Sequence, residues 1–117
     1  MAEEREGGLN PEKSLMVMAK TGPLLAQARG ELTYMEEFRK SKKALLMKAA
    51  EVAGHTASNA QEREAYADEG YVEHLVALQA ATEKYEALRW KMVTAQAAID
   101  VWRSQEASNR GMDRGAA

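Results

Sequence analysis

Five basic side chains lie within ten residues of the chain, and no carboxylate lies among them. They are Arg39, Lys40, Lys42, Lys43 and Lys48. On a helix, residues 39, 42 and 43 share one face, residue 40 lies to the side, and residue 48 extends the patch by one turn. Lysine and arginine neutralise phosphates regardless of base sequence, so this basic cluster is a candidate phosphate-binding track. A solvated helix face is the alternative reading of such a charge run.

Aromatic residues next to basic ones are the second candidate for chemistry. Tyr66 follows Arg63, and Trp90 stands between Arg89 and Lys91. An exposed ring beside a cation can stack on a nucleobase, and an ordinary cation–π pair or a second packing face is the alternative. We therefore add Arg63 and Tyr66 to the candidate nucleic-acid contacts.

No arrangement typical of catalysis or metal binding stands out. His55 and His74 are 19 residues apart, and neither has a second metal ligand at helical spacing. The acidic residues between positions 62 and 73 are best interpreted as a solvated helix face, because hard cations need oxygen ligands from several directions. The sequence thus predicts a protein that is not an enzyme and that holds no metal or cofactor.

Composition limits the fold and the compartment. The chain has 117 residues, no cysteine and a formal net charge of −2, with 16 basic against 18 acidic side chains. Absence of cysteine favours a reducing compartment, and no stretch reaches the roughly 20 apolar residues that cross a bilayer. Few Gly and Pro residues and only 6% aromatics argue against a β-sandwich or barrel. We expect a soluble, cytoplasmic, all-α protein with no membrane partner.

The elements that must position these residues follow from helix start and stop signals. Residues 1–9 are predicted to be a disordered leader, residues 10–110 a single helical domain and residues 111–117 a disordered tail. Asn10 followed by a proline predicts the start of a short helix, Pro11 to about Lys20, ended by Thr21-Gly22-Pro23.

A long second helix is expected from about Pro23 to Ala53, with Gly54 as its left-handed cap. Ser58 and Gln61 match a capping box that would open a third helix near Asn59. Gly70 would interrupt or kink that helix, which we expect to fray after about Ser108. The predicted architecture is a long helical hairpin with a short N-terminal helix.

An apolar heptad pattern runs along the last helix and predicts self-assembly. From Ala81 onward the apolar spacings alternate between four and three residues, as in a coiled coil. Helices of this length cannot bury their stripes inside one compact domain of this size, so we expect a homo-oligomer, more readily a ring than a dimer. The predicted interface residues are Leu75, Leu78, Tyr85, Leu88, Met92, Ile99 and Trp102.

Three segments of the chain resemble known phage proteins. The run 34-YMEEFRKSKKALLMKAAEVA-53 and the run 63-REAYADEGY-71 resemble the UvsY-type recombination mediators of bacteriophages. The segment 98-AIDVWRSQEASNR-110 is similar to the ending of a widespread group of small phage proteins. The resemblance covers about residues 31–110, and its motifs are short.

The resemblance implies a non-catalytic role in recombination. Mediators of this family bind single-stranded DNA as rings of identical subunits and help a recombinase displace single-stranded-DNA-binding protein. Arg63 and Tyr66 match the family's basic and aromatic motif, whereas Gln61 lacks the charge found there, which moves more of the expected DNA contact to the basic cluster. The alternative is a helical adaptor, a phage assembly chaperone or an inhibitor of a host protein, acting through protein contacts alone.

Overall fold

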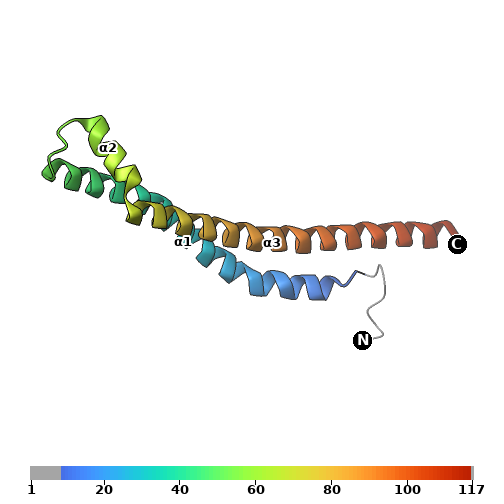
Figure 1. The fold of residues 1–117 in the computed structure, drawn as a ribbon. Coiled ribbons are helices and arrows are strands. Elements are labelled where there is room, and N and C mark those ends of the chain that lie inside the picture. Colours follow the sequence, from blue (N-terminus) through green and yellow to red (C-terminus); the bar gives the residue numbers. More distant parts are fainter. Residues whose placement is uncertain (1–8, 117) are drawn as a thin grey trace. The chain divides into compact units, whose positions relative to one another are not determined.

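The protein is described by a computed structural model that covers residues 9–116, and these residues form three helices (Figure 1). They are α1, Pro11–Val52; α2, Ser58–Ala67; and α3, Glu69–Ala116. No strand occurs in this range, which confirms the all-α prediction. The predicted leader lies, apart from Leu9, outside the described residues. None of the three helices is long and apolar enough to cross a membrane.

The first helix begins where expected but does not end at Thr21. The Asn10 Oδ1 atom accepts a hydrogen bond from the Lys13 backbone N–H at 3.1 Å, so Asn10 is the predicted N-cap. The prediction of a separate short helix is wrong, because α1 continues through Pro23 to Val52. The proline ring disfavours helical conformation of the preceding residue by clashing with its backbone N–H and its Cβ, and Gly22, which has no Cβ, avoids the second of these clashes. Pro23 itself is exposed, so its ring meets no packed neighbour.

The turn between α1 and α2 has one predicted and one unpredicted feature. Gly54 has a φ of +113°, and the His55 backbone N–H donates to the Ala50 carbonyl at 3.0 Å, as expected for a glycine cap. The Ser58 capping box is absent: α2 follows Ala57 without a side-chain cap. Gln61 instead donates from Nε2 to the His55 carbonyl oxygen at 2.9 Å, which ties α2 to the turn.

A single residue separates α2 from α3. Asp68 has an extended backbone, and its Oδ1 atom accepts hydrogen bonds from the backbone N–H groups of Gly70 (2.8 Å) and Tyr71 (3.3 Å). This arrangement is an aspartate N-cap, so the break lies two residues before the glycine that we expected to cause it. At its other end α3 runs to Ala116, beyond the expected fraying point at Ser108 and through most of the predicted disordered tail.

The chain divides into two compact units. The first unit comprises the chain up to Leu25 together with Ala87 onward, and the second comprises Ala26–Glu86. In the second unit, contacts such as that of Arg29 with Tyr85 and that of Phe38 with His74 show that α1 and α3 run antiparallel.

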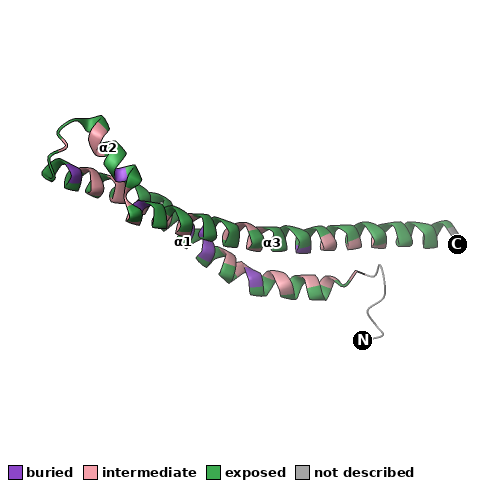
Figure 2. Cartoon of the chain, viewed as in Figure 1, coloured by how far each residue is buried: buried purple, intermediate pink, exposed green. Residues whose placement is uncertain are grey.

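Both units are built on small side chains. Five of the seven buried apolar residues in the described part of the chain are alanines. Figure 2 shows that only isolated positions along the helices are buried. In the second unit Leu32 and Tyr71 are the larger buried side chains, and in the first unit Ala95 and Thr21 are buried. Alanine at a helix contact allows a short interaxial distance, but it removes little apolar surface from water. The free energy of unfolding is therefore expected to be sensitive to single changes in α1 and α3.

The continuity of α1 predicts the effect of replacing Pro23. Within a helix, proline lacks the N–H that would bond to the carbonyl four residues earlier and costs about 3 kcal/mol relative to alanine. We expect Pro23→Ala to raise the free energy of unfolding by roughly 1–3 kcal/mol in urea titrations followed by circular dichroism. A loss of stability would instead fit two separate helices, with Pro23 at the start of the second.

Candidate nucleic-acid interface

The basic cluster is split by the fold into exposed and half-buried members. Arg39 and Lys48 are exposed and make no ion pair with any described residue. Lys40 is exposed as well and lies 3.2 Å from the Glu37 carboxylate, one helical turn away. Lys42 and Lys43 are half-buried against the rest of the second unit. Three of the five cations therefore point to solvent, and two take part in packing.

Lys43 connects the basic cluster to α2. Its Nζ atom lies 3.4 Å from Glu62 Oε2 and 4.8 Å from the centre of the Tyr66 ring. The pKa of Lys43 is raised above its ordinary value, chiefly by hydrogen bonding with the Tyr66 side chain; burial opposes this rise, and the charge of Glu62 adds a smaller contribution that raises the pKa. The two sets of candidate DNA contacts, separate in the sequence, thus meet at Lys43 and Tyr66.

Lys42 reaches the start of α3. A Cβ atom placed on Gly70 would lie 3.2 Å from Lys42 Nζ and 3.0 Å from Asp68 Oδ1. The aspartate oxygen is the N-cap acceptor and is not free to move away. Because glycine has no Cβ, position 70 leaves room for both the Asp68 cap and the Lys42 side chain.

The remaining α2 candidates are accessible. Tyr66 is 45% exposed and packs edge-on against the buried Tyr71, with 5.4 Å between ring centroids. Arg63 is exposed, and no ion pair or ring contact joins it to the basic cluster among the described residues. Tyr66 is therefore held by Tyr71 on one side and by Lys43 on another, and it still presents part of its ring to solvent.

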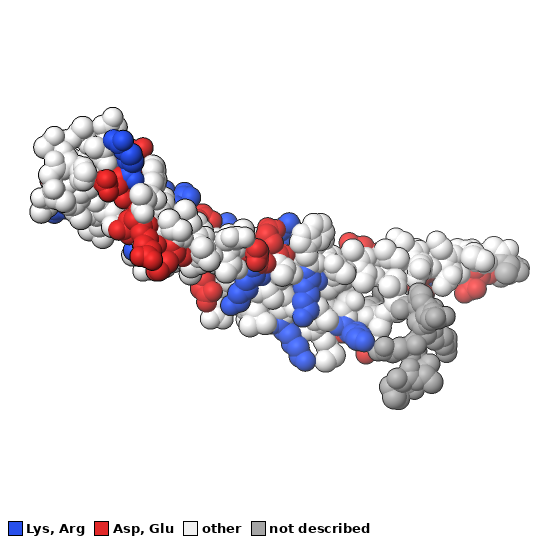
Figure 3. Space-filling model, in the orientation of Figure 1, with Lys and Arg blue, Asp and Glu red and all other residues white. Residues whose placement is uncertain are grey.

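The second unit is not basic as a whole. Residues 26–86 carry eight Lys and Arg against eleven Asp and Glu, a net charge of −3. Figure 3 shows acidic and basic side chains interspersed on the visible face, without a continuous basic surface. A polyanion would therefore meet local groups of cations and not a uniform positive field.

The predicted oligomer interface is partly covered within one chain. Leu78 and Tyr85 in the second unit are half-buried. The same is true of four predicted residues in the first unit, which are Leu88, Met92, Ile99 and Trp102. Leu75 is exposed. Because α1 is one long helix, segments of it pair with α3 inside each unit. The length of the helices therefore no longer requires an oligomer to cover their apolar residues.

The histidines are engaged in structural contacts. His74 Nε2 lies 2.8 Å from the Met35 carbonyl oxygen, and its ring packs on Phe38. His55 lies just beyond the end of α1, 3.7 Å from Glu64 Oε1. No group of three or more His, Asp and Glu side chains within residues 9–116 is arranged to hold a metal ion.

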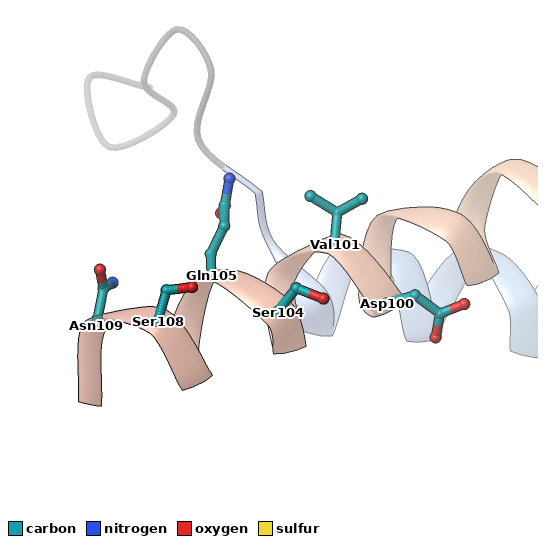
Figure 4. Close-up of a pocket in the computed structure, with 6 residues that line it drawn as sticks. All are labelled: Asp100, Val101, Ser104, Gln105, Ser108 and Asn109. Carbon is teal, nitrogen blue, oxygen red and sulfur yellow. The ribbon is translucent and has the colours of Figure 1, made fainter. Parts of the chain in front are cut away.

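Two further surfaces lie in the first unit. Trp90 is exposed and lies against the Arg89 guanidinium at 5.4 Å, so a cation–π contact is present. A hollow of about 390 Å³ follows α3 and is shown in Figure 4. Its described lining consists of Asp100, Val101, Ser104, Gln105, Ser108 and Asn109. All six come from one helix, so no side chain of another described element converges on them.

The environment of Lys43 leads to a measurable pH effect. A lysine whose pKa is raised in the folded state stabilises the fold at pH values below the unfolded pKa, and this stabilisation is lost as the pH rises through the folded pKa. We expect Tyr66→Phe to lower the pKa of Lys43 more than Glu62→Gln does, in side-chain NMR titrations through the alkaline range. Glu83→Gln, an equal charge change elsewhere in the second unit, is the control. If Lys43 has the same pKa in the wild type and in Tyr66→Phe, the hydrogen bond between Lys43 and Tyr66 is contradicted.

Comparison of the chain with known protein families, with curated protein sequences and with solved structures finds no match. The resemblance to phage recombination mediators therefore rests on the quoted residues alone.

Proposed function

We propose that this protein binds single-stranded DNA without sequence preference and assists the loading of a recombinase, without catalysing a reaction itself. The observation that carries the proposal is the contact between Lys43 and Tyr66, which joins the basic cluster on α1 to the aromatic residue on α2. A half-exposed ring beside a cation is a combination that accepts a base on its face and a phosphate at its edge.

Exposed ion pairs do not block such a site. Lys43 and Glu62 side chains are 31% and 48% exposed, and the Lys40–Glu37 pair is more exposed still. Surface pairs of this kind contribute about 0–1 kcal/mol, so a phosphate can replace either carboxylate at little cost. Arg39 and Lys48 need no such exchange, and because they are nine residues apart they offer contacts on opposite sides of α1. The two carboxylates would then lower the affinity only modestly.

The exposed cations should control DNA affinity. We expect Arg39→Glu, Lys48→Glu to weaken binding of an oligothymidylate at least about tenfold in fluorescence anisotropy at low salt. With about three phosphates neutralised per chain, the slope of log affinity against log salt should be near −2. Arg110→Glu, Arg114→Glu makes the same charge change at the end of α3 and is the matched control.

Removing a negative charge beside the basic cluster should strengthen DNA binding. In the same assay Glu62→Gln, which leaves Lys43 free for a phosphate, should raise affinity by about two- to threefold, whereas Glu83→Gln should not. If wild type fails to bind the oligonucleotide at low salt, or if the control pair loses as much affinity as Arg39→Glu, Lys48→Glu, the proposal is wrong.

A separate observation supports self-assembly as part of this function. Three large apolar residues lie on one face of α1, at spacings close to whole helical turns: Tyr34, Leu45 and Val52 are 68%, 63% and 83% exposed. Phe38, half-buried, stacks on Tyr34 with 5.9 Å between ring centroids and lies on the same face. We define these four residues as the α1 stripe. Copies of the chain joined through it would repeat weak DNA sites along one strand, which adds to affinity through effective concentration.

The α1 stripe predicts how assembly can be disrupted. Sedimentation equilibrium at micromolar concentration should give a mass above the 12.9 kDa of one chain, and Leu45→Glu should return it to 12.9 kDa with unchanged helical content. Val76→Glu, at a residue that is 62% exposed on α3, should leave the mass unchanged. A wild-type mass of one chain would contradict the homo-oligomer. If DNA binding is absent as well, an adaptor that uses the stripe for another protein becomes the better proposal.

A further inference from the structure

A groove in the first unit has a composition unlike the rest of the surface. It lies between the start of α1 and the middle of α3 and consists of two adjoining hollows of about 450 and 240 Å³, which share Lys13, Val17 and Lys91. We call it the lysine groove. No carboxylate is among the described residues, 9–116, that line either hollow.

The rim of the lysine groove is cationic. Lys13 and Lys20 are seven residues apart, two helical turns, and so lie on one face of α1. Lys91 faces them from α3, although it is 71 residues beyond Lys20 in the sequence. Lys20 and Lys91 are exposed and form no ion pair within residues 9–116. Lys20 and Lys91 therefore present positive charge from two helices, and no carboxylate among the described lining residues balances it.

The described lining of the groove between these lysines is apolar and contains no aromatic ring. It includes Val17, Ala95 and Ala98, and Met16 beside Lys20. A lysine side chain can lay its methylene groups along apolar surface while its ammonium group remains in water. The three lysines of the rim therefore extend the apolar surface of the floor. The groove can therefore accept aliphatic or aromatic side chains on its floor and anionic groups at its lysine rim.

The geometry points to an acidic, amphipathic peptide as the occupant of the lysine groove. Two packed helices leave a flank open, and a third helix that lays its apolar face into that flank is a common mode of peptide recognition. Carboxylates at the edges of such a peptide would meet Lys20 and Lys91. A nucleic-acid strand fits less well, because it uses aromatic faces for stacking and gains little from a floor of alanine and valine.

The test uses the full chain and a defined probe. A fluorescein-labelled 16-residue peptide with Leu at i, i+3, i+4, i+7 spacing and Glu at the other positions is titrated by fluorescence anisotropy, with a Lys-for-Glu version as control. We expect the acidic peptide alone to bind, and Lys20→Glu, Lys91→Glu to weaken it at least about tenfold. Thr94→Trp, which fills the groove from an exposed lining position without a charge change, should weaken it as well.

Two controls separate this inference from general charge effects and from DNA binding. Arg110→Glu, Arg114→Glu makes the same charge change outside the groove and should bind the peptide like wild type, and so should Arg39→Glu, Lys48→Glu in the second unit. Unchanged peptide affinity in Lys20→Glu, Lys91→Glu, or an equal loss in Arg110→Glu, Arg114→Glu, would overturn the inference. It would also be overturned if the groove variants lost oligothymidylate binding while wild type bound no peptide, since the groove would then be a nucleic-acid contact.

Discussion

The pairing of α1 with α3 through alanine faces is the constraint on which the rest of the molecule depends. Alanines at positions 28, 81 and 95 are buried, and few larger side chains are buried with them. Close approach of the helices gives dispersion contacts along much of their length, but each alanine removes little surface from water. A fold stabilised in this way leaves most side chains exposed and depends on well-formed helix ends. The Asn10 and Asp68 caps and the Gly54 turn meet that need.

The same pairing decides what the charged residues can do. A lysine on the face that packs cannot remain fully solvated, so it must find a carboxylate or an aromatic ring, as Lys43 does with Glu62 and Tyr66. The other cations of the cluster on α1, such as Arg39 and Lys48, remain exposed to water. The basic cluster thus serves both packing and surface charge, and the proposed DNA site lies where these two roles meet.

Functionally, the two units present different chemistry. Residues 26–86 combine a negative total charge with local cations, the exposed Tyr66 ring and the α1 stripe. The lysine groove in the other unit combines cations with an apolar floor, and none of its described lining residues is acidic. A nucleic-acid strand and an acidic peptide make different demands on a surface, so one small chain could hold both without competition between them.

Much of this protein was determined by the local sequence alone. Helical content, the Asn10 cap and the Gly54 cap followed from side-chain type at particular positions, because capping depends on residues only a few places apart. The basic residues between positions 39 and 48 indicated a candidate phosphate-binding surface, because they also lie close together in the sequence. Gly22 stands beside Pro23 in the sequence, but the packing of this part of α1 against α3 does not show there, so local signals predicted a helix end where α1 continues. Tertiary structure alone decided that Lys43 meets Tyr66 and that Lys91 faces Lys20. Such pairs are separated by 23 and 71 residues, and only the antiparallel packing of the helices, which no local pattern encodes, brings them together.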